Sequence, residues 1–175
     1  MIQELKYLKI LVLGANGVGK TAILNKIGEE IFEKEEYSTL AIGRYQAKIE
    51  VEQETYFFQF WDFKDELKIE GITHKFYRNA NGALIVFDLS RPDTLNRAKF
   101  YLDSLRHYLP EQIPFILVGN KVDLVEDLDS VINRREIIRY AKSRGGIYIE
   151  DYLDDLENLK IALIKLYEKV LMATH

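Results

Sequence analysis

The chain has 175 residues, with 24 basic and 28 acidic side chains and a formal net charge of −4 at pH 7. This length suits one domain with a sizeable core, which we expect to span residues 1–175. The chain is slightly acidic and has no block of basic residues, so it lacks the positive charge typical of nucleic-acid-binding proteins, and we expect no nucleic-acid partner. The longest apolar runs are strand-sized and too short to cross a membrane. The lack of cysteine excludes disulfides, thiolate metal sites and lipid-modified cysteines.

The first six residues mix acidic and basic side chains and contain no apolar signal segment. The Met1-Ile2 start lacks the glycine that N-myristoylation requires. We therefore expect a cytoplasmic protein with no lipid anchor of its own, which a partner would have to recruit to membranes.

The first predicted element is an apolar strand over residues 8–13, and the run GANGVGKT follows it at residues 14–21. A helix-compatible segment, expected to end near Glu30, comes next. Strand, glycine-rich loop and helix in this order are typical of a phosphate-binding P-loop, whose backbone N–H groups point into one concavity. Lys20 would reach the outer phosphates, and the Thr21 hydroxyl would bind Mg²⁺. The alternative is a glycine-rich turn with a chance lysine.

Further strands are predicted after a loop over residues 31–43. Polar and apolar residues alternate over 44–51, and a second strand-like run covers 55–62 after a short polar link. Together these runs indicate a hairpin at a sheet edge. Two continuous apolar runs, 82–88 and 114–119, are typical of strands buried on both faces of a parallel sheet.

Helices are expected between and after these strands. Apolar residues at helical spacing predict one helix over 95–109. Ser130 could cap the next helix, and the Gly145-Gly146 pair would end it. A short strand over 147–149 precedes a final helix, which the capping pair formed by Asp154 and Glu157 would open.

Strands that alternate with helices indicate an α/β protein with an open, mostly parallel sheet. We expect a P-loop three-layer fold: six strands, one of them an antiparallel edge strand, with helices on both faces. Ligands of such sheets bind at the carboxyl ends of the strands. The chemistry should therefore lie just past Leu13, Trp61, Phe87 and Val118, and motifs follow all of these except Phe87.

A second nucleotide motif, Asn-Lys-Val-Asp, occupies residues 120–123 after the strand that ends near Val118. The Asp123 carboxylate can accept two N–H bonds, and guanine offers two adjacent donors on its N1/N2 edge. Adenine has no such pair, so this carboxylate would select against it. Asn120 could bond the imidazole side of the base, and the Lys121 stem could cover its face. The alternative is a polar turn after a strand.

With these two motifs the chain resembles the small GTPases of the Ras superfamily, nearest to the Rab type, over almost its whole length. Residues 14–21 resemble the first guanine-nucleotide box of that family and 120–123 the fourth. The resemblance implies that Thr39 binds Mg²⁺ in the triphosphate state, that Phe32 packs against the guanine edge and that Asp62 holds the metal through water. An ordinary loop aromatic and a plain loop threonine are the alternatives for Phe32 and Thr39.

The resemblance implies GTP or GDP and Mg²⁺ as cofactors. The expected nucleotide-binding residues are Asn16, Gly17, Val18, Gly19, Lys20, Thr21, Ala22, Phe32, Asn120, Lys121, Asp123 and Leu124. The expected metal ligands are Thr21, Thr39 and, through water, Asp62, and the expected catalytic residues are Lys20 and Glu66. Effector or regulator proteins would bind the surface from Thr39 to Val51 and from Asp62 to Arg78.

The chain departs from the family in the third box, which reads Asp-x-x-Gly followed by a Gln that orients water. Asp65 stands in place of the glycine and Glu66 in place of the glutamine. A carboxylate about 4 Å from the γ-phosphate costs roughly 4 kcal/mol at an effective dielectric of 20. Glu66 can accept a hydrogen bond from water but cannot donate one to phosphate as an amide does. We therefore expect GTP hydrolysis that is slow or uses another geometry.

Two more departures concern the ends of the site. Asn16 stands where many relatives have a small residue, and its side chain could crowd a partner's arginine finger. The fifth box is missing, because residues 150–154 read Glu-Asp-Tyr-Leu-Asp where the family has Ser-Ala-Lys. Backbone N–H groups there could still contact the guanine oxygen.

Three functions remain open from the sequence. The first is a GTP-binding switch that hydrolyses GTP and controls partner binding through its two switch loops. The second is a non-hydrolysing GTP-binding scaffold, which the altered pair at residues 65–66 favours. The third, a P-loop kinase acting on a small molecule, would need a lid rich in arginine, and the sequence has no such segment.

Overall fold

The computed structural model describes residues 7–30, 42–63, 76–109 and 111–173. Seven strands within these ranges form one sheet in the order β2-β3-β4-β1-β5-β6-β7. The strands are β1 (Leu8–Leu13), β2 (Glu29–Glu30), β3 (Ile42–Val51), β4 (Glu54–Phe63), β5 (Gly82–Asp88), β6 (Phe115–Asn120) and β7 (Gly146–Glu150). Strands β4, β1, β5, β6 and β7 run parallel, whereas β3 is antiparallel to β4 and β2 to β3.

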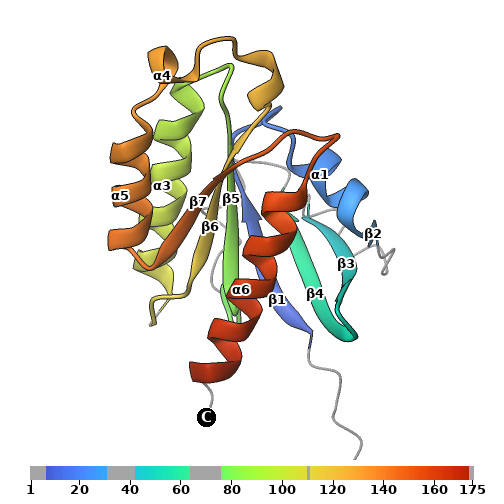
Figure 1. The fold of residues 1–175 in the computed structure, drawn as a ribbon. Coiled ribbons are helices and arrows are strands. Elements are labelled where there is room, and N and C mark those ends of the chain that lie inside the picture. The colour runs from blue at the N-terminus through green and yellow to red at the C-terminus, as the bar shows by residue number, and fades with distance from the viewer. Residues whose placement is uncertain (1–6, 31–41, 64–75, 110, 174–175) are drawn as a thin grey trace, which may run out of the picture.

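Helices cover both faces of this sheet (Figure 1). They are α1 (Lys20–Ile27), α3 (Asp93–Tyr108), the short α4 (Leu128–Val131), α5 (Arg134–Ser143) and α6 (Glu157–Ala173), with a 3₁₀ turn η2 at Val122–Leu124. Helices α1 and α6 pack on one face, and α3 and α5 pack on the other. The prediction of a mostly parallel six-stranded sheet with one antiparallel strand and two helical layers is confirmed, and the two-residue β2 extends that sheet beyond β3.

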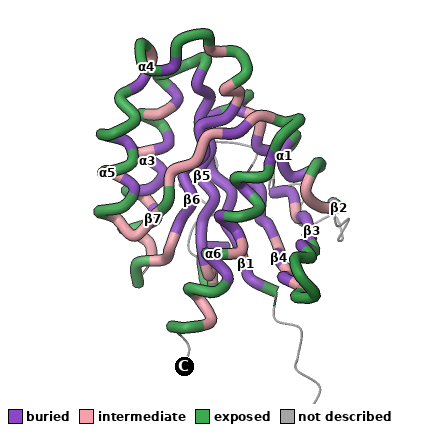
Figure 2. Tube along the Cα trace, viewed as in Figure 1, coloured by how far each residue is buried: buried purple, intermediate pink, exposed green. Residues whose placement is uncertain are grey.

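Alternation along β1 shows why two cores form. Leu8, Ile10 and Val12 face α1 and α6, whereas Leu11 and Leu13 face α3 and α5. Successive side chains of a strand point to opposite faces, so a fully apolar strand must be covered on both sides. Figure 2 shows the result, with buried strands in the middle and exposed outer helix surfaces.

The first predicted helix extends too far. Helix α1 ends at Ile27, and Gly28 is extended and donates its N–H to Leu24 O. A Cβ on Gly28 would lie 2.5 Å from the carbonyl oxygen of Gln46, so the chain leaves the helix against the β3 backbone at a place that only glycine fits. Residues 29–30 then pair with β3, which itself begins at Ile42, two residues before the predicted start.

Two predicted helix caps are also wrong. Ser130 lies inside α4, and α5 begins after Asn133, whose side chain accepts the N–H of Glu136 at 3.2 Å. The first turn of α6 donates to two other carboxylates and not to Asp154: Asp155 accepts the Glu157 N–H at 3.2 Å, and Asp151 accepts the Leu159 N–H at 2.8 Å. Neighbouring polar residues can all cap in principle, and tertiary packing decides which one sits at the helix start.

Lys9 on β1 lies against the aromatic ring of Trp61 on β4. Its Nζ is 4.2 Å from the ring centroid and donates to Arg78 O at 2.9 Å, and the guanidinium carbon of Arg44 lies 4.7 Å from the same ring. Burial, aided by the charge of Arg44, lowers the pKa of Lys9 to about 8. Two cations therefore lie against the buried Trp61 ring, and one of them, Arg44, belongs to the expected partner-binding surface.

Core packing on α6 gives a first prediction. Leu163 is fully buried and Ile161 is 45% exposed on the same helix. Leu163→Ala is expected to lower the free energy of unfolding by about 2–5 kcal/mol, because the cavity it leaves adds to the lost transfer free energy. Ile161→Ala is the matched control, with an expected loss under about 1 kcal/mol. Urea denaturation measures both, and equal losses would contradict the packing described above.

The pKa of Lys9 gives a second prediction. In the folded protein Lys9 releases its proton near pH 8, whereas in the unfolded chain it keeps it up to about 10.5. The unfolded state therefore binds more protons between these values, and this group makes the free energy of unfolding rise with pH from about 8 upward. Lys9→Met is expected to remove that contribution. Urea denaturation from pH 7 to 9.5 tests it, and parallel profiles for the two proteins would refute it.

Candidate functional site

The loop between β1 and α1 lies at the carboxyl ends of the parallel strands, at the upper end of the sheet in Figure 1. Three glycines in this loop have positive φ: Gly14 (153°), Gly17 (78°) and Gly19 (103°). A Cβ on Gly14 would lie 2.3 Å from Val86 O, and one on Gly19 would lie 2.4 Å from Asn120 Nδ2. The loop can therefore follow this path only where side chains are absent.

Lys20, the first residue of α1, folds back over the loop. Its side chain is buried, and Nζ donates to Gly14 O at 2.5 Å and to Ala15 O at 3.1 Å. Gly19 is the N-cap, and no side chain of the described residues caps the helix. The unsatisfied N–H groups of a helix start and an ammonium beside them form a site suited to phosphate oxygens.

Thr21 and Asp62 bring two oxygen ligands together beside this loop. Thr21 Oγ1 donates to Asp62 Oδ2 at 2.7 Å, and Asp62 is fully buried near the end of β4. A hydroxyl and a carboxylate are ligands that suit Mg²⁺, so this pair fits the metal expected from the sequence. The third expected ligand, Thr39, lies outside the described residues.

The Asn-Lys-Val-Asp motif meets the P-loop directly, although about a hundred residues separate them. Asn120, at the end of β6, donates from Nδ2 to Val18 O at 2.8 Å, and Lys121 Nζ donates to Gly17 O at 2.9 Å. Asn120 Oδ1 is buried and has no hydrogen-bond partner among the described residues. A buried acceptor of this kind ordinarily has a hydrogen-bond partner.

Asp123 and Leu124 lie in the turn η2 just beyond Lys121, and both are exposed. Lys121 itself has φ 63°, which turns the chain sharply at the end of β6. The Asp123 carboxylate is therefore carried on a tight turn at the rim of the site, next to the two residues that contact the P-loop.

Of the other predicted residues, Asn16 and Ala22 are exposed at the loop and on α1. Phe32 and Glu66, like Thr39, lie outside the described residues. The structure thus brings together the P-loop, Asp62, Asn120 and Lys121.

Asp88 and Arg91 were not among the predicted site residues, yet both lie at this edge. Asp88 ends β5, is almost completely buried, and accepts Lys121 Nζ at 2.8 Å and Arg91 Nε at 3.2 Å. Burial pushes the pKa of Asp88 up, but hydrogen bonds from Lys121, Ser90 and Arg91 outweigh it and hold that pKa below its usual value. Position 88 follows Phe87, the one expected strand end for which the sequence showed no motif.

The segment in place of the fifth box is held close to the fourth motif. Asp151 N donates to Gly119 O at 3.0 Å, and Val122 N donates to Asp151 O at 3.4 Å. The buried Asp151 carboxylate accepts the Leu159 N–H at 2.8 Å, and burial raises its pKa. This carboxylate therefore anchors the start of α6 and is not directed to the site as a ligand would be.

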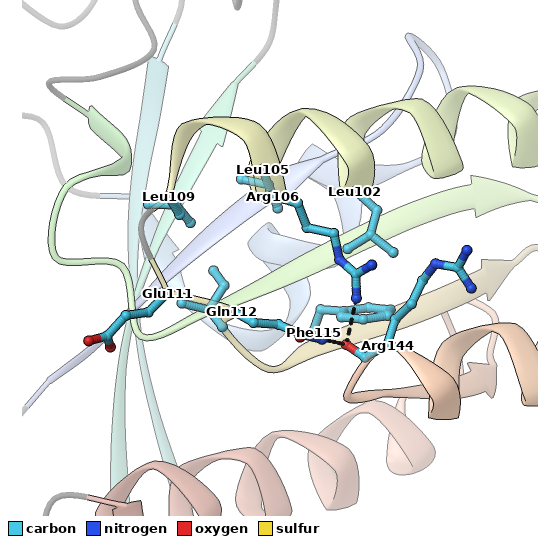
Figure 3. Close-up of a pocket in the computed structure, with 9 residues that line it drawn as sticks. Leu102, Leu105, Arg106, Leu109, Glu111, Gln112, Phe115 and Arg144 are labelled. Atoms are coloured by element: carbon cyan, nitrogen blue, oxygen red, sulfur yellow. Dashed lines mark hydrogen bonds between the residues drawn. The ribbon is translucent and has the colours of Figure 1, made fainter.

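A separate depression lies between the ends of α3 and α5 (Figure 3). Leu102, Leu105 and Phe115 line its floor. Its two cations are engaged in packing, because Arg106 donates to Arg144 O at 3.3 Å and the Arg144 guanidinium stacks 3.9 Å from the Tyr140 ring centroid. Phe115 begins β6, so this depression lies at the opposite end of that strand from Asn120 and is not the candidate site.

Among the described residues no helix is long and apolar enough to span a bilayer.

Comparison with known proteins gives the same assignment as the geometry. The Ras family model matches residues 9–172. The chain is 29% identical to GTP-binding protein ypt1 of Schizosaccharomyces pombe over 97% of this chain and 83% of that protein. It is 29% identical to GTP-binding protein YPTM1 of Zea mays over 94% and 78%, and 27% identical to Ras-related protein Rab-1D of Dictyostelium discoideum over 91% and 78%.

These matches confirm the resemblance inferred from the two motifs. Guanine-nucleotide binding and GTPase activity are general properties of the family, and so is the binding of effector or regulator proteins. The chain therefore belongs to the Ras family, as a Rab-like small GTPase.

Proposed function

We propose that residues 1–175 act as one guanine-nucleotide-binding domain, a switch that binds GTP and GDP with Mg²⁺ and hydrolyses GTP slowly. The observation that carries this proposal is the direct contact of the two nucleotide motifs: Asn120 and Lys121 donate to carbonyls of the P-loop at 2.8 and 2.9 Å. A single ligand with phosphates at one end and a base at the other would span this junction.

The phosphates would lie against the N–H groups of residues 16–22, at the start of α1. Lys20 would supply the neutralising charge, and its hydrogen bonds to Gly14 O and Ala15 O hold the ammonium inside the curve of the loop before a ligand arrives. Such preorganisation lowers the cost of ordering the site when nucleotide binds. Thr21 and Asp62 would hold Mg²⁺, which when bound neutralises charge on the phosphates.

The base would lie beside Asn120 and the Lys121 stem, with Asp123 facing its N1/N2 edge. A carboxylate accepts both guanine N–H groups, and adenine would leave it unpaired. The family resemblance extends to this motif, and η2 carries Asp123 at the rim where a base could reach it.

Slow hydrolysis follows from residues 65–66, which lie outside the described part of the chain. Asp65 in place of glycine would set a negative charge near the γ-phosphate, and Glu66 lacks the amide donor of glutamine. If these two changes abolish hydrolysis completely, the protein has a second candidate function, that of a scaffold that binds GTP and does not hydrolyse it. The Asp65-Glu66 pair is the observation that favours it.

Partner proteins would bind the surface from Thr39 to Val51 and from Asp62 to Arg78, whose conformation would depend on the bound nucleotide. Arg44 lies in the described part of this surface and gives it positive charge, with its guanidinium carbon 4.7 Å from the ring centroid of the buried Trp61. The protein would act in the cytoplasm, and a partner would bring it to membranes.

Base selection gives a third prediction. Asp123→Asn replaces one acceptor by a donor, so it loses one bond to guanine and gains one to the 2-oxo group of xanthine. Affinity for GDP is expected to fall roughly ten- to a hundredfold and affinity for xanthosine diphosphate to rise. Titration calorimetry measures both. Asp127→Asn, a nearby exposed carboxylate, is the control and should bind GDP as the wild type does. An unchanged preference in the Asp123 variant would refute the role given to this residue.

The third box gives a fourth prediction. Replacing both Asp65→Gly and Glu66→Gln is expected to raise single-turnover GTP hydrolysis at least about tenfold, because it removes repulsion and restores an amide donor. Phosphate release from GTP-loaded protein is the measurement. The matched control makes the same two types of change at another adjacent acidic pair, which is exposed: Glu126→Gln with Asp127→Gly. This control should hydrolyse GTP at the wild-type rate. The slow-hydrolysis proposal would be refuted if the wild type hydrolysed GTP as fast as the double variant does.

A further inference from the structure

Arg91 lies between β5 and α3 and reaches across to the P-loop. Its Nη2 donates to Asn16 O at 3.1 Å, and the same nitrogen lies 3.4 Å from the place where a Cβ on Gly17 would be. The guanidinium is therefore packed against the outer surface of the loop apex. No motif of the sequence includes Arg91, and the proposed function gives it no role.

Asp88 fixes the direction of this guanidinium. One carboxylate oxygen of Asp88, Oδ2, accepts Arg91 Nε at 3.2 Å and Lys121 Nζ at 2.8 Å. The other, Oδ1, accepts both the N–H and the hydroxyl of Ser90. The carboxyl group is almost fully buried, so it holds the two cations at a fixed place beside the loop.

The two cations contact successive carbonyls of the P-loop. Arg91 donates a hydrogen bond to the carbonyl of Asn16, and Lys121 donates one to the carbonyl of Gly17 at 2.9 Å. Both carbonyls are thus held on the outside of the curve. In a loop of this kind the N–H groups point to the opposite side from such carbonyls, into the concavity where an anion binds.

We propose that Arg91 is a positioning residue of the phosphate site: it sets the conformation of Asn16 and Gly17, so that the loop presents its N–H groups to the phosphates before nucleotide arrives. This inference rests on the proposed function and adds to it a residue that acts through the loop backbone without touching the base. Lys121 also bonds a carbonyl of this loop, but it lies beside the proposed base site as well. A change at Arg91 should therefore affect phosphate binding alone, whereas a change at Lys121 would affect both ends of the nucleotide.

Arginine suits this role better than lysine. Its planar fork holds separate N–H donors in a fixed geometry, so that Nε bonds the Asp88 carboxylate while Nη2 bonds the Asn16 carbonyl, whereas an ammonium is a point charge on a flexible stem. The Arg91 side chain is 46% exposed, so the hydrophobic cores do not depend on it. Its removal should therefore alter the loop and leave the fold intact.

The test measures dissociation of a fluorescent GDP analogue from the full chain with Mg²⁺ present. Arg91→Ala is expected to speed dissociation roughly three- to tenfold, the range of a charge-assisted hydrogen bond that solvent partly screens. Arg91→Lys should fall between the wild type and the alanine variant. Arg106→Ala removes the same charge from the far, exposed end of α3 and should dissociate GDP at the wild-type rate.

Two further readouts separate positioning from a structural role. The ratio of GDP affinity to inosine diphosphate affinity should stay at the wild-type value in Arg91→Ala, because the base site is untouched. The rise in melting temperature that GDP produces should shrink, while the melting temperature without added nucleotide stays within about 2 °C of the wild type.

Dissociation from Arg91→Ala at the wild-type rate would overturn the inference. So would an equal loss of melting temperature with and without GDP, since that result describes a structural residue. A wild-type protein that binds no GDP analogue would instead refute the proposed function, and the wild-type measurement alone reveals it.

Discussion

The structure depends on how one glycine-rich loop is held. Residues 14–19 pass through three glycines with positive φ, and because glycine has wide conformational freedom, the loop residues alone do not fix this path. Three hydrogen bonds from two other parts of the chain hold it: Asn120 donates to Val18 O, Lys121 to Gly17 O, and Arg91 to Asn16 O. Lys20 closes the loop from within by bonding Gly14 O and Ala15 O. Each of these donors bonds a carbonyl, so none of them uses an N–H group of the loop, although Val18 N–H donates to Ala15 O at 3.4 Å within the loop.

Buried carboxylates at this edge accept hydrogen bonds. Asp62 accepts Thr21, and Asp88 accepts Lys121 and Arg91, so each buried carboxylate has donors beside it. An unpaired carboxylate in such a place would cost several kcal/mol or take up a proton. The lowered pKa of Asp88 shows that it stays ionised at neutral pH, which keeps both cations oriented. Binding of an anionic nucleotide therefore meets a site that already carries ordered positive charge.

The base end of the site is built differently from the phosphate end. Asp123 stands on an exposed turn, and the segment after β7 uses its buried carboxylate, Asp151, to anchor α6. Glu150 forms a two-pronged salt bridge with Arg134 at 2.8 Å on both oxygens, so it too is occupied. What this segment can offer a ligand is its backbone. In the proposed function, base selection would therefore be concentrated in Asn120 and Asp123, and the phosphate end would supply much of the affinity.

The sequence by itself determined the layered α/β fold, because uniformly apolar strands alternating with helical patterns allow few other arrangements. It also determined the P-loop and the Asn-Lys-Val-Asp motif, since each is local and carries its chemistry in adjacent residues. The sequence did not determine where helices end or which residues cap them. Helix α1 stops at Ile27 because the β3 backbone lies against Gly28, and the residues around Gly28 carry no sign of that distant contact. Only the tertiary structure brought Asp88 and Arg91 to the loop. Their roles arise from strands that meet at one edge of the sheet, and contacts between residues so far apart in the chain leave no local signal.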